Sequence, residues 1–175
     1  DKATLINKVL EGAVVQADTI IPPGMPGFND AAAKIQKLNV ADAKSLLAEA
    51  GYPDGKDFPK VSLTINNQDP NYAKIVAALQ QMWKENLGVD IQVSTEELAK
   101  FNDDLTATAN NPTDAAALTF YVSVWGADYP DPQNWLIFFW MSTASFAINV
   151  RYNNPALDKI LAEADKSTDP AARLA

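Results

Sequence analysis

Two helical patterns alternate with three strand patterns in this 175-residue chain, and this alternation constrains its fold more than any other feature. Residues 61–65 and 89–93 alternate apolar and polar side chains, as strands with one buried face do. The run 117–125 is nearly continuous in β-forming residues, which predicts a strand buried on both faces. The order of the elements describes two successive βαβ units. We therefore expect an α/β fold with a mostly parallel sheet covered by helices.

The helix between the first two strands has clear start and end signals. Proline suits the first helical position, so Asp69 and Pro70 predict its beginning, and Gly88 predicts its end. Its apolar face follows helical spacing over Tyr72, Ile75, Val76, Leu79, Met82 and Trp83. A shorter helix is expected over residues 96–106, between the second and third strands.

Further elements are predicted on both sides of this core. Residues 2–11 have helical spacing, and residues 18–28 hold three prolines that exclude regular structure. Asn39 and Asn154 are both expected to cap helices. The predicted buried positions of the helix after Asn39 are Leu46, Leu47 and Ala50.

The absence of histidine and cysteine from the sequence excludes several kinds of site. A Ser-His-Asp or Cys-His arrangement and a zinc site built from imidazole or thiolate all need these residues. We expect no metal and no cofactor. The formal net charge of −8, without a cluster of lysine and arginine, argues against nucleic acid as a partner. No segment approaches the roughly twenty apolar residues that span a bilayer.

Most carboxylates have an ordinary structural explanation. Glu96 and Glu97 are expected in the first turn of a helix, where negative charge is favourable. Asp103 and Asp104 are expected on a solvated helix face. Asp131 stands before a proline and predicts a helix cap.

Asp128 has no such explanation and is the main candidate site residue. It lies between the aromatic residues Trp125 and Tyr129, where the chain is expected to leave the third strand. Ligands of parallel sheets bind outside the carboxyl ends of the strands. A carboxylate flanked by rings suits a cationic group such as an amine. Asp128, Trp125 and Tyr129 are therefore the predicted ligand-binding residues.

The helix expected over residues 133–140 is apolar on nearly all sides. Two interpretations remain open for it. Either another body, such as a further part of the protein, covers one of its faces, or it is a deeply buried core helix.

Residues 125–132, WGADYPDP, resemble the signature in the second lobe of the family 5 extracellular solute-binding proteins. These are the oligopeptide- and dipeptide-binding components of bacterial ABC importers. Other stretches resemble the family in the same order. They are the opening helix at 1–12, the proline loop at 21–27, the helix and turn at 43–55, and the segment 152–165.

The resemblance implies one lobe of a type II periplasmic-binding-protein clamp. Residues 1–175 are then a single α/β lobe, truncated at both ends, and an N-terminal lobe is missing. In this family the aspartate corresponding to Asp128 binds the α-amino group of a peptide, and the tryptophan corresponding to Trp125 lines the pocket. The implied partners are short peptides and a membrane permease, and the implied location is periplasmic or at the cell surface.

Two other functions remain open at this point. A sugar-binding or other small-solute-binding member of the family would rely on stacking by Trp125 and Tyr129, with Asp128 accepting hydrogen bonds from hydroxyl groups. A glycosidase fragment would use Asp128 and Asp131 as acid and base. We expect no enzymatic activity, because the sequence has no histidine or cysteine. In addition, Asp128 and Asp131 are only three residues apart, and Asp131 is explained as a cap.

Overall fold

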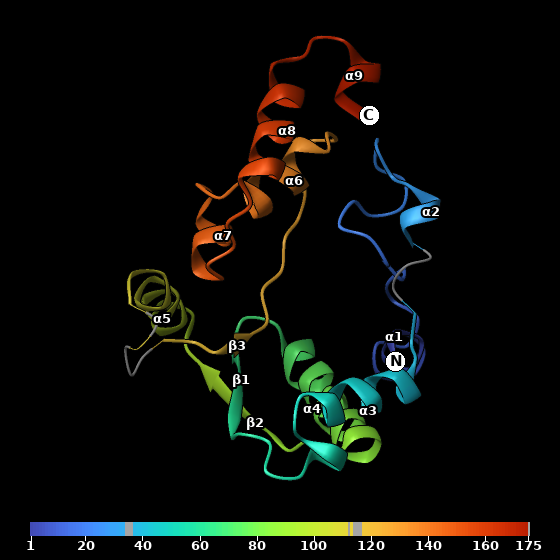
Figure 1. The fold of residues 1–175 in the computed structure, drawn as a ribbon, viewed down its shortest axis with the longest axis vertical. Helices are drawn as coiled ribbons and strands as arrows, with labels where there is room; N and C mark the ends of the chain where they lie inside the picture. The colour runs from blue at the N-terminus through green and yellow to red at the C-terminus, as the bar shows by residue number, and fades with distance from the viewer. Residues whose placement is uncertain (34–36, 112, 114–116, 175) are drawn as a thin grey trace. The chain divides into compact units, whose positions relative to one another are not determined.

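The computed structural model of the protein describes residues 1–33, 37–111, 113 and 117–174 (Figure 1). Its helices, including a π-helical turn η1 and a 3-10 turn η2, and its strands are, in chain order, α1 (Lys2–Thr4), η1 (Leu5–Val9), α2 (Asp30–Ala33), α3 (Val40–Glu49), η2 (Pro53–Gly55), β1 (Val61–Asn66), α4 (Pro70–Leu87), β2 (Ile91–Glu96), α5 (Leu98–Asn110), β3 (Phe120–Tyr121), α6 (Gln133–Trp140), α7 (Ser145–Asn149), α8 (Pro155–Lys166) and α9 (Pro170–Leu174).

The chain divides into two compact units. The first contains Asp1–Gln16, Lys37–Asp104 and Leu118–Ser123. The second contains Ala17–Gln36, Leu105–Ala117 and Val124–Ala175. The sheet belongs to the first unit, and the predicted ligand-binding residues belong to the second.

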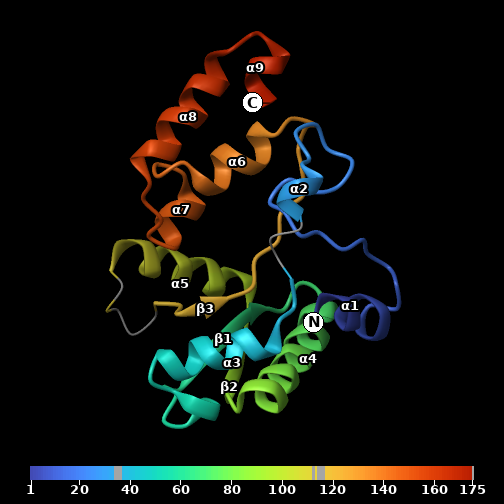
Figure 2. The ribbon, with the colours of Figure 1, turned by 45° about the vertical axis from the view of Figure 1, so that its right-hand side comes forward.

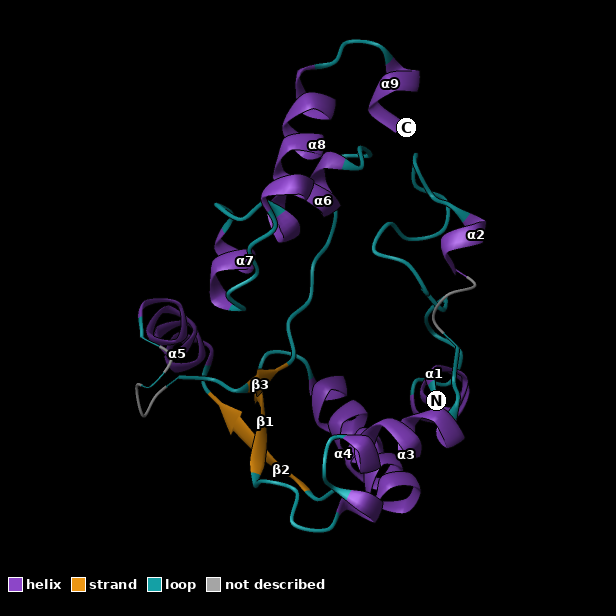
Figure 3. Ribbon diagram, viewed as in Figure 1, coloured by secondary structure: helices purple, strands orange, loops and turns teal. Residues whose placement is uncertain are grey.

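In the first unit, three parallel strands form a sheet in the order β2-β1-β3 (Figure 3). β1 pairs with β2 along its whole length, from Val61 opposite Ile91 to Asn66 opposite Glu96. β3 pairs with the other edge of β1, where Phe120 lies opposite Leu63. The parallel α/β arrangement predicted from the sequence is confirmed.

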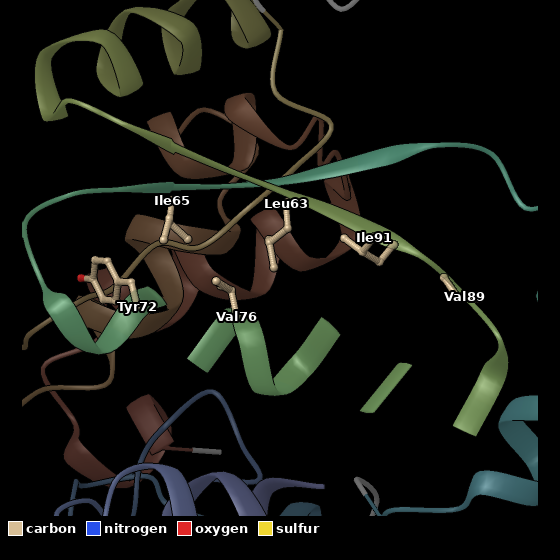
Figure 4. Packing of buried hydrophobic residues seen from close by; sticks show 6 residues of the cluster. All are labelled: Leu63, Ile65, Tyr72, Val76, Val89 and Ile91. Carbon is tan, nitrogen blue, oxygen red and sulfur yellow. The ribbon is translucent and has the colours of Figure 1, made fainter. Parts of the chain in front are cut away.

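A cluster of apolar side chains between the sheet and α4 forms the core of this unit. Leu63, Ile65 and Ile91 point from the strands toward Tyr72 and Val76 of α4 (Figure 4). Leu63, Ile65 and Val76 are almost completely buried. Each such aliphatic side chain contributes about 1.5–3 kcal/mol when it is removed from water. The helical spacing that predicted the apolar face of α4 is thereby confirmed.

Helices cover both faces of the sheet at β3. The ring of Phe120 lies 5.7 Å from Trp83 of α4, and the ring of Tyr121 lies 6.0 Å from Phe101 of α5. Because successive side chains of a strand point to opposite faces, α4 and α5 contact opposite sides. Burial here raises the pKa of the Tyr121 phenol above its usual value.

The predicted helix boundaries are confirmed where a side chain caps the helix. Asp69 accepts a hydrogen bond from the backbone N–H of Asn71 at 2.8 Å, so α4 begins with Pro70. Asn39 and Asn154 cap α3 and α8 in the same manner. Gly88 ends α4 in the left-handed conformation, with φ of 69°.

The prediction of a long third strand, buried on both faces, is wrong. β3 contains only Phe120 and Tyr121, and Phe120 is 39% exposed. β3 is an edge strand that pairs with β1 alone, and Val122 adds one further backbone hydrogen bond to Thr64. Val124 is already exposed. The apolar run 117–125 therefore extends beyond the residues of β3 that pair with β1.

The predicted buried stripe of α3 is also wrong in part. Leu47 packs against the core, but Leu46 is 64% exposed and Ala50 is exposed as well. Val40 and Ala43, which lie before Leu47 on the same side, are the other partly buried positions on this helix. α3 contacts α4 along one narrow stripe, so the neighbouring apolar positions remain in solvent.

In the second unit, α6 contacts both α7 and α8, and α8 contacts α9 (Figure 2). α2 and α7 are short helices that the sequence patterns did not predict. The sequence left open whether α6 is a deeply buried core helix, and the structure shows that it is not. All positions of α6 are described, and Asn134 is the only buried one, whereas Phe138 is 41% exposed. No helix within the described residues has the length and apolar character needed to cross a membrane.

We predict that Gly88→Ala strongly destabilises the first unit. An alanine Cβ at this position would lie 2.0 Å from the backbone oxygen of Asp54, in addition to the strain of a positive φ. We expect the free energy of unfolding to fall by at least about 2 kcal/mol in urea denaturation.

Gly51→Ala is the matched control for this substitution. Gly51 also has a positive φ, of 95°, but no heavy atom lies within 4 Å of the added Cβ. We expect a loss of about 1 kcal/mol from backbone strain alone. Equal losses in the two variants would show that the contact between Gly88 and Asp54 does not matter.

We also predict a modest destabilisation of the second unit by Arg173→Met. The Arg173 guanidinium donates to both carboxylate oxygens of Asp131, at 2.9 and 3.0 Å. Both side chains are partly exposed, so the expected loss is only about 1 kcal/mol, measured by thermal or urea unfolding. Lys159→Met removes the same charge from a looser, exposed pair with Glu163 and should change stability by much less. A larger effect of Lys159→Met would contradict this ranking.

Candidate functional site

The segment that carries the predicted site residues is an irregular stretch that enters α6. Backbone and side-chain hydrogen bonds close its last turn. The backbone N–H of Asp131 donates to the backbone carbonyl oxygen of Tyr129 at 2.9 Å, and the backbone N–H of Gln133 donates to Asp131 Oδ1 at 2.8 Å. Asp131 therefore holds the beginning of α6, and its carboxylate is also paired with Arg173. Asp131 is therefore a structural residue, as predicted, but α6 begins at Gln133 with Pro132 in the cap position, one residue later than the cap that the sequence predicted.

Asn134, in the first turn of α6, joins two of the predicted site residues. Its side chain has 0% relative exposure. Asn134 Oδ1 accepts hydrogen bonds from Trp125 Nε1 at 2.8 Å and from the backbone N–H of Asp128 at 3.1 Å. Asn134 Nδ2 donates to Asp128 Oδ2 at 3.3 Å. One buried amide thus holds the indole of Trp125 and both the backbone and the carboxylate of Asp128.

These partners also determine the orientation of the Asn134 amide. Two N–H donors meet one side-chain atom, which must be the oxygen. The opposite orientation would place the amide nitrogen against two donors and its oxygen against a carboxylate. Asn134 was not among the residues predicted from the sequence. The available signal was a polar amide inside an otherwise apolar helix.

The Asp128 side chain is exposed, and within the described part of the chain it has no ion-pair partner. The hydrogen bonds that the structure gives to Asp128 all involve Asn134. Its carboxylate is therefore held on one side and open on the other. Such a group can accept charge-assisted hydrogen bonds from a cationic ligand.

Trp125 is half-buried in a cluster of aromatic rings within the second unit. Its ring centroid lies 5.6 Å from Phe138, 5.4 Å from Phe139 and 5.5 Å from Phe146. Phe139 and Phe146 stack on each other at 4.4 Å. These contacts, together with the hydrogen bond to Asn134, fix the position of the indole.

Tyr129 is more exposed and has separate partners. The residue is 37% exposed, and its hydroxyl donates to Gln133 Oε1. Gln133 Nε2 in turn donates to Asp165 of α8. No ring contact among the described residues joins Tyr129 to Trp125. The structure thus brings Trp125 and Asp128 together, whereas Tyr129 is held by a second group of side chains.

Two expectations about other carboxylates are wrong. Glu96 is the last residue of β2 and not part of a helix, and Asp104 is buried and not on a solvated face. Both pair with Lys100: Asp104 lies one helical turn after Lys100 on α5, and Glu96 ends the strand just before this helix. Hydrogen bonds to Asp104 and Glu96 raise the pKa of Lys100 above its usual value, and the bond to Asp104 has the larger effect. No group of three or more acidic residues within the described ranges could hold a metal ion.

Comparison with known proteins identifies the family. Residues 1–147 match the model of bacterial extracellular solute-binding proteins, family 5 middle region. The chain is 30% identical to the oligopeptide-binding protein OppA of Bacillus subtilis (strain 168) and 33% identical to the periplasmic murein peptide-binding protein MppA of Escherichia coli (strain K12). In both cases the match covers 99% of this chain.

The structure gives the same result as the sequence. The solved structure of the Escherichia coli murein tripeptide-binding protein MppA matches 99% of this chain with a TM-score of 0.81 and 31% identity. The expected α/β fold class, shared with periplasmic peptide-binding proteins, is confirmed. The chain spans about a third of the length of these relatives, 31% of the curated sequences and 33% of the solved chain. From the match of residues 1–147 and these relatives, the chain belongs to the bacterial extracellular solute-binding proteins of family 5.

Proposed function

We propose that this chain is part of a solute-binding protein that captures short peptides by their free α-amino group. Asp128 accepts hydrogen bonds from the ammonium group, while Trp125 and Tyr129 line the ligand site. The observation that carries this proposal is the exposed Asp128 carboxylate, which Asn134 holds on one side and which no cation neutralises within the described residues.

An ammonium group fits this carboxylate for a physical reason. A hydrogen bond to a charged group contributes about 1.5–3 kcal/mol, roughly twice a neutral one. Asp128 would gain this energy from a ligand cation, since none of the described residues forms an ion pair with it. The carboxylate is already oriented by Asn134, so less conformational freedom is lost on binding.

The contacts of Trp125 favour a peptide over a sugar. Recognition of a sugar by stacking needs an open aromatic face, and Trp125 is surrounded by Phe138, Phe139 and Phe146. Its Nε1 is also bonded to Asn134. A glycosidase is disfavoured as well, because the carboxylate of Asp131 is occupied by Arg173. The proposed protein binds and releases its ligand unchanged.

The named relatives support a peptide ligand and a longer parent protein. The Bacillus subtilis relative is named for binding oligopeptides, and the Escherichia coli relative for binding murein peptides in the periplasm. Since the chain spans about a third of each relative, we infer that residues 1–175 are part of one lobe and that an N-terminal lobe completes the site. We infer an extracytoplasmic location and delivery of the peptide to the membrane permease of an ABC importer.

We predict that Asp128→Asn weakens peptide binding by the full-length protein about 10- to 100-fold, because one charge-assisted interaction is lost. Isothermal titration calorimetry with a free tripeptide, such as trialanine, measures this change. N-acetylated trialanine should bind the unmodified protein more weakly by a similar factor. Its affinity should change little on Asp128→Asn, because it has no ammonium group to lose.

Asp103→Asn is a control that removes the same charge from an exposed carboxylate on α5. It should leave both affinities unchanged. Equal binding of the free and acetylated peptides to the unmodified protein would contradict recognition of the amine. In that case oligosaccharides and metal complexes should be tested as ligands.

A further inference from the structure

We propose that Asn134 is a positioning residue for ligand recognition. Its amide holds the Asp128 carboxylate in the orientation that discriminates a free amine from a neutral amide. This inference rests on the proposed function of Asp128. Asn134 is completely buried and acts through Asp128, so it does not itself have to contact the ligand.

The contact between Asn134 and Asp128 is made at two points. The Asn134 oxygen accepts from the backbone N–H of Asp128, and its nitrogen donates to Asp128 Oδ2. The first bond fixes the main chain, and the second restricts rotation of the carboxylate. Asp128 belongs to an exposed, irregular stretch that includes Gly126, which has no heavy atom within 4 Å of the position of a Cβ. Such a stretch would otherwise leave the carboxylate mobile.

The Asn134 amide is anchored on its other side by the aromatic cluster. Its oxygen also accepts from Trp125 Nε1, and the indole packs against Phe139 of α6 and Phe146 of α7. The two phenyl rings stack at 4.4 Å with an angle of 21° between their planes. The position of the carboxylate is therefore set relative to two helices and not by the loop alone.

The arrangement also determines which carboxylate oxygen is left for the ligand. Asn134 donates to Oδ2, and the structure gives no hydrogen bond within the described residues to Oδ1. An ammonium group can bind Oδ1 while the bond to Asn134 is kept. An oriented carboxylate forms strong charge-assisted hydrogen bonds with an ammonium group, which has three N–H donors. An N-acetylated peptide offers only a single neutral N–H, which forms a weaker hydrogen bond. Selectivity for the amine should therefore depend on Asn134.

The test uses Asn134→Leu in the full-length protein, which preserves the size of the side chain but removes the amide. The measured quantity is the ratio of the dissociation constants of N-acetylated and free trialanine, from calorimetry. We expect this ratio to fall by about tenfold. Leu161→Ala is the control, since it removes a buried side chain from α8 in the same unit. It should lower the melting temperature and leave the ratio unchanged.

The double variant with Asp128→Asn tests whether Asn134 acts through Asp128. In the Asp128→Asn background, Asn134→Leu should change the ratio no further, because coupled residues are not additive. If Asn134→Leu does not fold, Asn134→Ser removes the same bond to Oδ2 with a smaller disturbance and should change the ratio in the same direction.

Two results would overturn the inference, and they can be told apart. If the unmodified protein selects the free amine and neither Asn134 variant changes the ratio, Asn134 is not a positioning residue and the proposed function stands. If the unmodified protein shows no selectivity, the proposed function fails and the positioning role fails with it.

Discussion

The first turn of α6 contains one buried side-chain amide, that of Asn134. The hydrogen bonds that this amide needs fix the conformation of the segment that leads into the helix. Asn134 has no access to water, and a buried amide without partners costs about 1–3 kcal/mol. Trp125 and Asp128 supply those partners through one indole nitrogen, one backbone N–H and one carboxylate oxygen. The same bonds that satisfy the amide thereby orient the candidate ligand-binding carboxylate. The structural role of Asn134 and its proposed role in ligand recognition therefore rest on the same hydrogen bonds.

The two units rely on different interactions. In the first, aliphatic side chains of β1 and β2 pack against α4, and parallel pairing aligns the strands. In the second, aromatic rings and polar side chains connect short helices, as the cluster around Trp125 and the pair between Asp131 and Arg173 show. A polar group near the surface costs less free energy when it lacks a protein hydrogen-bond partner than a buried one does, because water can bond to it. The second unit can therefore leave the Asp128 carboxylate exposed to solvent.

Sequence patterns predicted correctly the features that depend on neighbours in the chain. Asp69 caps α4, and the spacing from Tyr72 to Trp83 marks its buried face, because both are set within a few turns of one helix. The patterns failed where a distant partner decides. The run 117–125 has strand-forming residues throughout, but β1 pairs with only two of them in β3. Leu46 has the right spacing for burial, yet it is 64% exposed.

The same division applies to the candidate site. The sequence by itself determined the family, the parallel α/β class and the choice of Asp128 as a residue without a local structural role, since these follow from residue types and their order. The tertiary structure alone decided that Asn134 joins Trp125 to Asp128, and that Asp104 is buried against Lys100. Hydrogen bonds between side chains depend on the separation and direction of atoms in space. Composition and spacing along the chain do not specify these until the helices and loops have packed.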